Sequence, residues 1–149
     1  MHAQAVIERR VESHNKLNTL LSTRKETLLC LNQLASMRPF KADEDVQNLL
    51  QEFCESLVDY TASAHFQLYS FIESGSERRS SINDLAESVY PRIADSTQII
   101  LDFNEKYDCC DSCNNLKHLD SDLSKLGEIL AERINYEDQI IELLIKGRD

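Results

Sequence analysis

The chain has 149 residues, enough for one domain with a sizeable core spanning residues 1–149, and its three Gly and two Pro are too few for a fold of many strands and tight turns. The chain contains 16 Lys and Arg and 26 Asp and Glu. The resulting net charge of −10 disfavours direct nucleic-acid binding, because contacts to phosphates need a basic surface. No apolar run is long enough for a membrane span and no secretory signal is visible, so we expect a cytoplasmic protein without membrane contact.

The first predicted helix covers about residues 3–36 and ends before Pro39, since the residue before a proline disfavours the helical region. Its apolar residues recur at helical spacing. They are Val6, Val11, Leu17, Leu20, Leu21, Leu28, Leu31 and Leu34.

The second predicted helix begins after Asp43, a suitable N-cap, and runs to about Glu73, where residues 74–76 end it. Its apolar stripe is expected to be buried. The stripe consists of Phe53, Leu57, Tyr60, Ala64 and Phe71.

Three carboxylates, Glu52, Glu55 and Asp59, lie on a neighbouring stripe of the same helix at three- and four-residue steps. An acidic edge beside an apolar seam is suited to binding a basic protein. His65 is open to two interpretations. It either contacts a partner or lines a polar interior, or it is a core histidine that fixes helix packing.

The third helical region covers about residues 82–107 and contains Pro91. We expect a break there, with one helix ending at Tyr90 and another beginning with Pro91 in its first turn, rather than one kinked helix. The buried side of this region is predicted to consist of Ile93, Thr97, Ile100, Leu101 and Phe103.

The fourth predicted helix covers about residues 116–146. Its apolar stripe consists of Leu119, Leu123, Leu126, Leu130, Ile134, Ile140 and Leu144. Arg133 and Glu137 interrupt that stripe, either as a paired polar layer in the core or, the interpretation we favour, as an edge pair on the solvated rim. Long helices joined by short loops predict an all-α, antiparallel up-down four-helix bundle.

Cys109, Cys110 and Cys113, followed by His118, are the strongest chemical signal in the chain. They leave open a metal- or thiol-dependent sensor, although irregular spacing and a reducing compartment favour ordinary loop cysteines. Cys30 and Cys54 fall at apolar helical positions and are expected to be small core residues. No Glu-x-x-His pair, nucleotide loop or nucleophile motif occurs, so we expect no enzyme, no metal site and no cofactor.

A family resemblance rests on the run Phe53-Cys54-Glu55-Ser56-Leu57-Val58-Asp59-Tyr60, followed by His65-Phe66, and on a second block at 123–138. Both are similar to the Rsd/AlgQ (regulator of sigma D) family of bacterial anti-sigma factors, although Ala64 stands where the family has Gly. The resemblance implies an all-helical regulator of transcription. Such a regulator binds the C-terminal, −35-reading domain of the primary sigma factor one-to-one and withdraws that factor from RNA polymerase.

The resemblance places Asp59 on an aspartate that matters for sigma binding in the family. Helix geometry adds Glu52 and Glu55 to the expected partner-binding residues, and Tyr60 and His65 complete the set.

Overall fold

The computed structural model describes residues 2–41, 43–69, 80–108 and 116–146. These ranges contain four α-helices, α1 (His2–Ala35), α2 (Glu44–Ala64), α4 (Ser80–Tyr107) and α5 (Leu119–Lys146), and one π-helical turn, η1 (His65–Tyr69). The described residues include no strand, which confirms the all-α fold class. None of these helices is long and apolar enough to cross a membrane.

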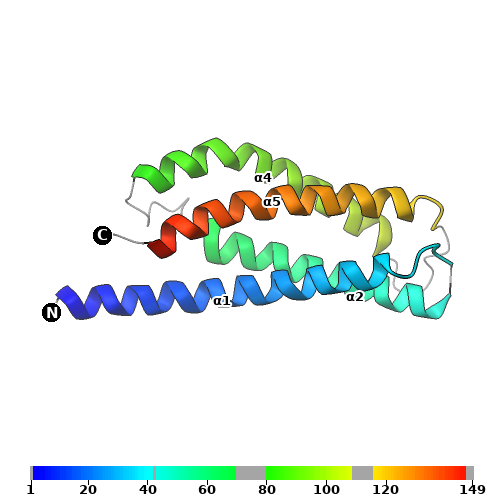
Figure 1. The fold of residues 1–149 in the computed structure, drawn as a ribbon, viewed down its shortest axis with the longest axis horizontal. Coiled ribbons are helices and arrows are strands. Elements are labelled where there is room, and N and C mark those ends of the chain that lie inside the picture. Colours follow the sequence, from blue (N-terminus) through cyan, green and yellow to red (C-terminus); the bar gives the residue numbers. More distant parts are fainter. Residues whose placement is uncertain (1, 42, 70–79, 109–115, 147–149) are drawn as a thin grey trace.

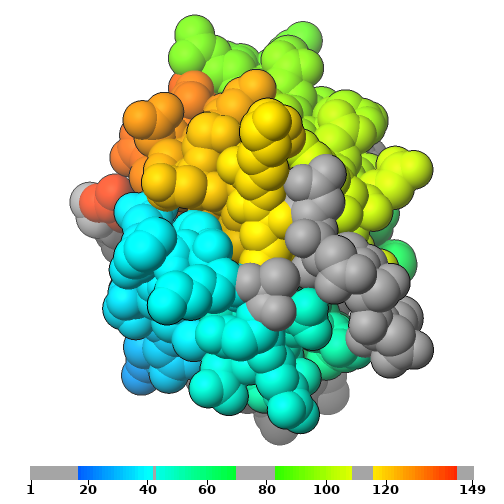
Figure 2. All heavy atoms as spheres, turned by 90° about the vertical axis from the view of Figure 1, so that its right-hand side faces the viewer, coloured from blue at the N-terminus to red at the C-terminus, as the bar shows by residue number. Residues whose placement is uncertain are grey.

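Successive helices run in opposite directions along the long axis of the molecule (Figure 1). Two ion pairs agree with this arrangement for α1 and α5: Arg24 in α1 meets Asp138 in the second half of α5, and Arg38, just after the end of α1, meets Asp120 at the start of α5. An end-on view places α1 and α2 in one half of the bundle and α4 and α5 in the other (Figure 2).

The start of α2 confirms the predicted N-cap. The Asp43 side chain accepts a hydrogen bond of 2.9 Å from the backbone N–H of Val46, and Glu44 and Asp45 follow in the first turn. This capping satisfies one of the free N–H groups at the helix start and places negative charge at its positive end.

A buried hydroxyl joins α1 to α2. Thr27 is buried, and its Oγ1 lies 2.9 Å from the carbonyl of Thr23 and 3.0 Å from that of Ser56. The polar group is therefore satisfied inside an interface that is otherwise apolar.

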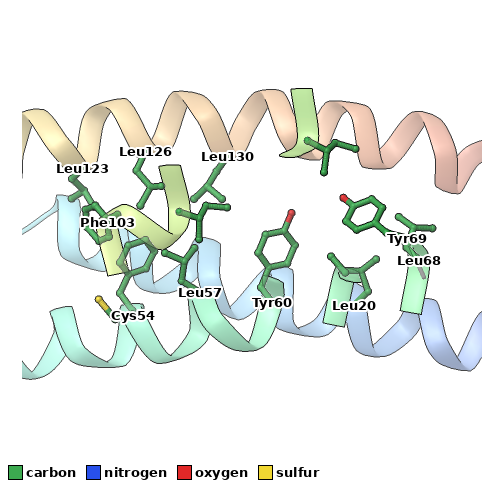
Figure 3. Packing of buried hydrophobic residues seen from close by; sticks show 14 of the residues in the cluster. Leu20, Cys54, Leu57, Tyr60, Leu68, Tyr69, Phe103, Leu123, Leu126 and Leu130 are labelled. Atoms are coloured by element: carbon green, nitrogen blue, oxygen red, sulfur yellow. The ribbon is translucent and has the colours of Figure 1, made fainter. Parts of the chain in front are cut away.

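The core lies between the two helix pairs and is built from the predicted stripes (Figure 3). Phe53 and Phe103 meet edge to face, with ring centroids 5.8 Å apart, and link α2 to α4. The prediction for Leu101 was wrong, since its side chain is 49% exposed on the outside of α4. Val6, Val11, Phe71 and Leu144 fall outside the described side chains.

The predicted break at Pro91 was wrong, because α4 continues from Ser80 to Tyr107 with Pro91 inside it. Pro91 has no N–H to donate to the carbonyl of Glu87, and Figure 1 shows that α4 is bowed. Val89 and Ile93, on either side of it, are both buried. Their packing holds both halves of α4 against the core and so outweighs the missing hydrogen bond.

Cys54 gives a test of this packing. Burial, with the carboxylates of Asp108 and Glu55 as smaller contributions, raises the pKa of its thiol to about 12. In the native protein at pH 8 this thiol should therefore resist iodoacetamide, and the half-buried Cys30 should react faster. Mass-spectrometric mapping of alkylated peptides over time measures both rates, and equal rates would contradict the burial of Cys54.

Candidate functional site: the outer face of α2

The outer side of α2 and η1 carries a continuous row of exposed side chains, which we call the α2 face. It consists of Glu52, Glu55, Val58, Asp59, Ala62, His65 and Phe66. The opposite side of the same helix is buried in the core, so packing fixes which residues face outward.

Negative charge concentrates in the first half of the α2 face. Glu52, Glu55 and Asp59 follow one another at three- and four-residue steps, and all three are exposed. Among the described residues no Lys, Arg or His forms an ion pair with any of them, and Gln51 Nε2 donates a hydrogen bond of 3.5 Å to Glu55 Oε1. The three carboxylates are thus available to cations from outside.

The second half of the α2 face is apolar. Phe66 is 71% exposed and Val58 is 45% exposed. The rings of His65 and Phe66 meet edge to face, with centroids 5.0 Å apart and an interplanar angle of 78°. A large aromatic ring held outward beside a row of carboxylates is typical of a protein-binding surface.

Four of the five predicted partner-binding residues lie together on this face: Glu52, Glu55, Asp59 and His65. The exposure of His65 excludes its interpretation as a core histidine. Phe66 was missed as a site residue, although its spacing carried the signal. It lies seven residues after Asp59, on the acidic stripe rather than the apolar one.

Tyr60 is placed apart from the other four. Its side chain is fully buried, and its hydroxyl donates a hydrogen bond of 2.6 Å to Glu137 Oε1. Tyr60 therefore lies outside the α2 face and belongs to a polar cluster inside the bundle.

That cluster centres on Arg133 and Glu137 of α5, which form an ion pair of 3.3 Å with both side chains buried. The favoured rim position for this pair was wrong, and the polar layer in the core is what forms. Glu137 also accepts a hydrogen bond of 2.6 Å from the hydroxyl of Tyr69, and Figure 3 shows the hydroxyls of Tyr60 and Tyr69 pointing into the same space below α5. Both oxygens of one carboxylate are thus occupied by tyrosines.

Arg133 extends the cluster to α4. Its Nη1 donates to Ser96 Oγ at 3.1 Å and to Thr97 Oγ1 at 2.7 Å, while its Nε donates to the hydroxyl of Tyr60 at 3.2 Å. The guanidinium carbon also lies 5.4 Å from the ring centroid of Tyr60 and 5.6 Å from that of Tyr69. The buried charge of Arg133 is therefore matched by hydrogen bonds as well as by Glu137, as a buried charge requires.

Arg24 of α1 also lies beside the cluster, close to Glu137. Its Nη1 lies 2.8 Å from Asp138 Oδ1 and 3.6 Å from Glu137 Oε1, as ion pairs whose N–H is not aligned for a hydrogen bond. Residues from α1, α2, η1, α4 and α5 thus meet around one carboxylate.

The electrostatics of the cluster keep it chemically inert. Burial raises the pKa of the Tyr60 and Tyr69 hydroxyls well above their usual range, and the negative Glu137 adds to this shift. Burial by itself lowers the pKa of Arg133, but Tyr60, Tyr69 and Glu137 outweigh it, and the pKa ends above its ordinary value. The tyrosines stay protonated donors and the arginine stays charged at neutral pH, as a structural role demands.

Within the described ranges no group of three or more His, Cys, Asp or Glu is placed to hold a metal ion. Cys109, Cys110 and Cys113 lie outside those ranges, and His118 is exposed at the start of α5.

Comparison with known proteins relates the chain to regulators of transcription. The family described as "Regulator of RNA polymerase sigma(70) subunit, Rsd/AlgQ" matches residues 1–145. The regulator of sigma D of Yersinia enterocolitica is 34% identical over 144 residues, which cover 91% of this chain and 84% of that protein. The regulator of sigma D of Yersinia pestis is 33% identical over 144 residues, with 91% and 83% covered.

A regulator of sigma D from Salmonella arizonae is 32% identical over 139 residues, with 91% of this chain and 85% of that protein covered. No solved structure gives a significant match.

Removal of Arg133, the buried cation of the cluster, should lower the stability of the protein strongly. Arg133→Met should lower the free energy of unfolding by about 3–5 kcal/mol, because Glu137 would remain buried without its main counter-charge. Urea denaturation followed by circular dichroism measures this, with Lys125→Met, an exposed position on α5, expected to change stability by less than about 0.5 kcal/mol. Equal stability of the two variants would contradict the burial of the pair.

Proposed function

Because this chain belongs to the Rsd/AlgQ family of regulators of the RNA polymerase sigma(70) subunit, we propose that it is an anti-sigma factor that binds the C-terminal domain of the primary sigma factor through the α2 face. Binding withdraws sigma from RNA polymerase in the cytoplasm. The action is stoichiometric, one monomer to one sigma, and needs no catalysis, cofactor or contact with nucleic acid. One observation carries the proposal: three exposed carboxylates and an exposed aromatic ring share one helix face in a chain of this family.

Charge complementarity supports the choice of the C-terminal domain. A domain that reads promoter DNA by a helix-turn-helix presents Lys and Arg toward phosphates. Glu52, Glu55 and Asp59 offer carboxylates to the same groups, with Asp59 able to accept a paired hydrogen bond from an arginine. A sigma domain held in this way has its DNA-binding surface covered.

The apolar end of the α2 face adds affinity that charge alone does not supply. Exposed ion pairs mainly raise the association rate and select the partner. Burial of a large exposed ring in an interface slows dissociation, and Phe66, beside His65 and two turns along from Asp59, is positioned for that role. The partner surface should accordingly combine arginines with an apolar pocket.

The acidic half of the face is tested by Asp59→Arg. We expect the affinity for the isolated C-terminal sigma domain to fall by about a hundredfold, because an attraction becomes a repulsion at the centre of the contact. Helical content and melting temperature should stay at wild-type values, since Asp59 is exposed. Glu128→Arg makes the same change of charge on α5 and should bind normally, and an unfolded Asp59→Arg protein would show Asp59 to be structural.

The apolar half is tested by Phe66→Ala. The affinity should fall by about tenfold or more, by a similar factor at low and high salt, because the lost contact is uncharged. Calorimetric titration at two salt concentrations measures this. Leu101→Ala, which truncates another exposed apolar side chain, is the matched control, and equal affinities of the two variants would remove Phe66 from the interface.

A further inference from the structure

We propose that Glu137, although fully buried, is a positioning residue for the α2 face. By accepting hydrogen bonds from Tyr60 and Tyr69 it holds the π-helical turn η1, and so fixes Phe66 and His65 relative to the acidic residues. The consequence for binding rests on the function proposed above, whereas the hold on η1 does not.

Tyr60 and Tyr69 each lie close in sequence to one half of the α2 face. Tyr60 directly follows Asp59, and Tyr69 comes three residues after Phe66. Their hydroxyls meet different oxygens of one carboxylate, each at 2.6 Å. Because the two oxygens belong to one rigid group, they fix the separation of the two hydroxyls. The acidic and apolar halves of the α2 face are thereby each tied from behind to one point.

The π-helical turn η1 determines the direction in which the Tyr69 side chain points. In an α-helix of 3.6 residues per turn, Tyr69 would lie on a different side from Ala64, five residues earlier. The wider π-helical turn of η1 brings Tyr69 inward, where it is only 6% exposed, while Phe66 stays 71% exposed. Without an anchor for Tyr69, the ordinary helical path would turn this side chain outward and rotate its neighbours with it.

The carboxylate of Glu137 is itself held in place by Arg133. The Arg133 guanidinium holds Glu137 from the side of α4, through its hydrogen bonds to Ser96 and Thr97. The hydroxyl of Tyr90 donates to the backbone carbonyl of Tyr69 at 3.3 Å, a second tie on η1. Glu137 is therefore held rigidly enough to act as a fixed point for α2 and η1.

The test uses Tyr69→Phe, which removes one hydroxyl and leaves the ring. Tyr136→Phe is the matched control, because among the described residues its hydroxyl is hydrogen-bonded to the exposed Arg92 and Glu132, which are not part of the α2 face. Three quantities are measured on the full chain: amide hydrogen exchange, the ring-proton resonances of His65, which report its contact with the Phe66 ring, and affinity for the C-terminal sigma domain.

In Tyr69→Phe we expect amides 65–69 to exchange about tenfold faster, amides 46–57 to stay unchanged and the His65 resonances to move. Affinity should fall by about tenfold, and Tyr136→Phe should match wild type throughout. If Tyr69→Phe is unfolded by circular dichroism, Glu137→Asp takes its place with the same expectations, because it keeps the charge beside Arg133 but draws the carboxylate away from the tyrosine hydroxyls.

Unchanged exchange at 65–69 would overturn the proposal, and so would faster exchange with undiminished affinity. If wild-type protein does not bind the sigma domain, the proposed function fails. Exchange and the His65 resonances then decide by themselves whether Glu137 holds η1.

Discussion

The arrangement of the described helices depends on the buried ion pair of Arg133 with Glu137. Such a pair must have every donor and acceptor satisfied, because an unmatched charge in the core costs several kcal/mol. Here the matching groups come from different helices: Tyr60 from α2, Tyr69 from η1, and Ser96 and Thr97 from α4. The helices must be placed so that these groups reach the pair, and apolar packing supplies the burial energy.

The different roles of the inner and outer sides of α2 follow from that constraint. The inner side supplies Phe53, Leu57 and Tyr60 to the core, so the residues on the opposite side of the helix face solvent. Three of those outer residues are carboxylates with no ion-pair partner among the described residues, and Phe66 continues the row. A helix held rigidly from behind presents such a surface with little loss of conformational freedom on binding, which favours affinity.

Local chemistry made much of this structure predictable. The helical spacing of the leucines, the Asp43 N-cap and the acidic stripe each depend on residues within a few positions, and each is found as expected. The errors concern contacts over long separations. Pro91 stays helical because Val89 and Ile93 pack on both sides of it, and the Arg133–Glu137 pair is buried because tyrosines some 70 positions away complete it. Spacing placed Tyr60 on the buried stripe, but it did not show the hydrogen bonds to Glu137 or the π-helical turn of η1 that brings Tyr69 inward.

A calorimetric titration of the wild-type protein with the isolated C-terminal domain of the primary sigma factor, at two salt concentrations, tests the proposed function most directly. We expect one-to-one binding that weakens as salt rises, because charged groups on α2 meet cations of the partner. Absence of binding to this domain and to full-length sigma would contradict it, and would mean that this member of the family has kept the bundle while its α2 face serves another partner.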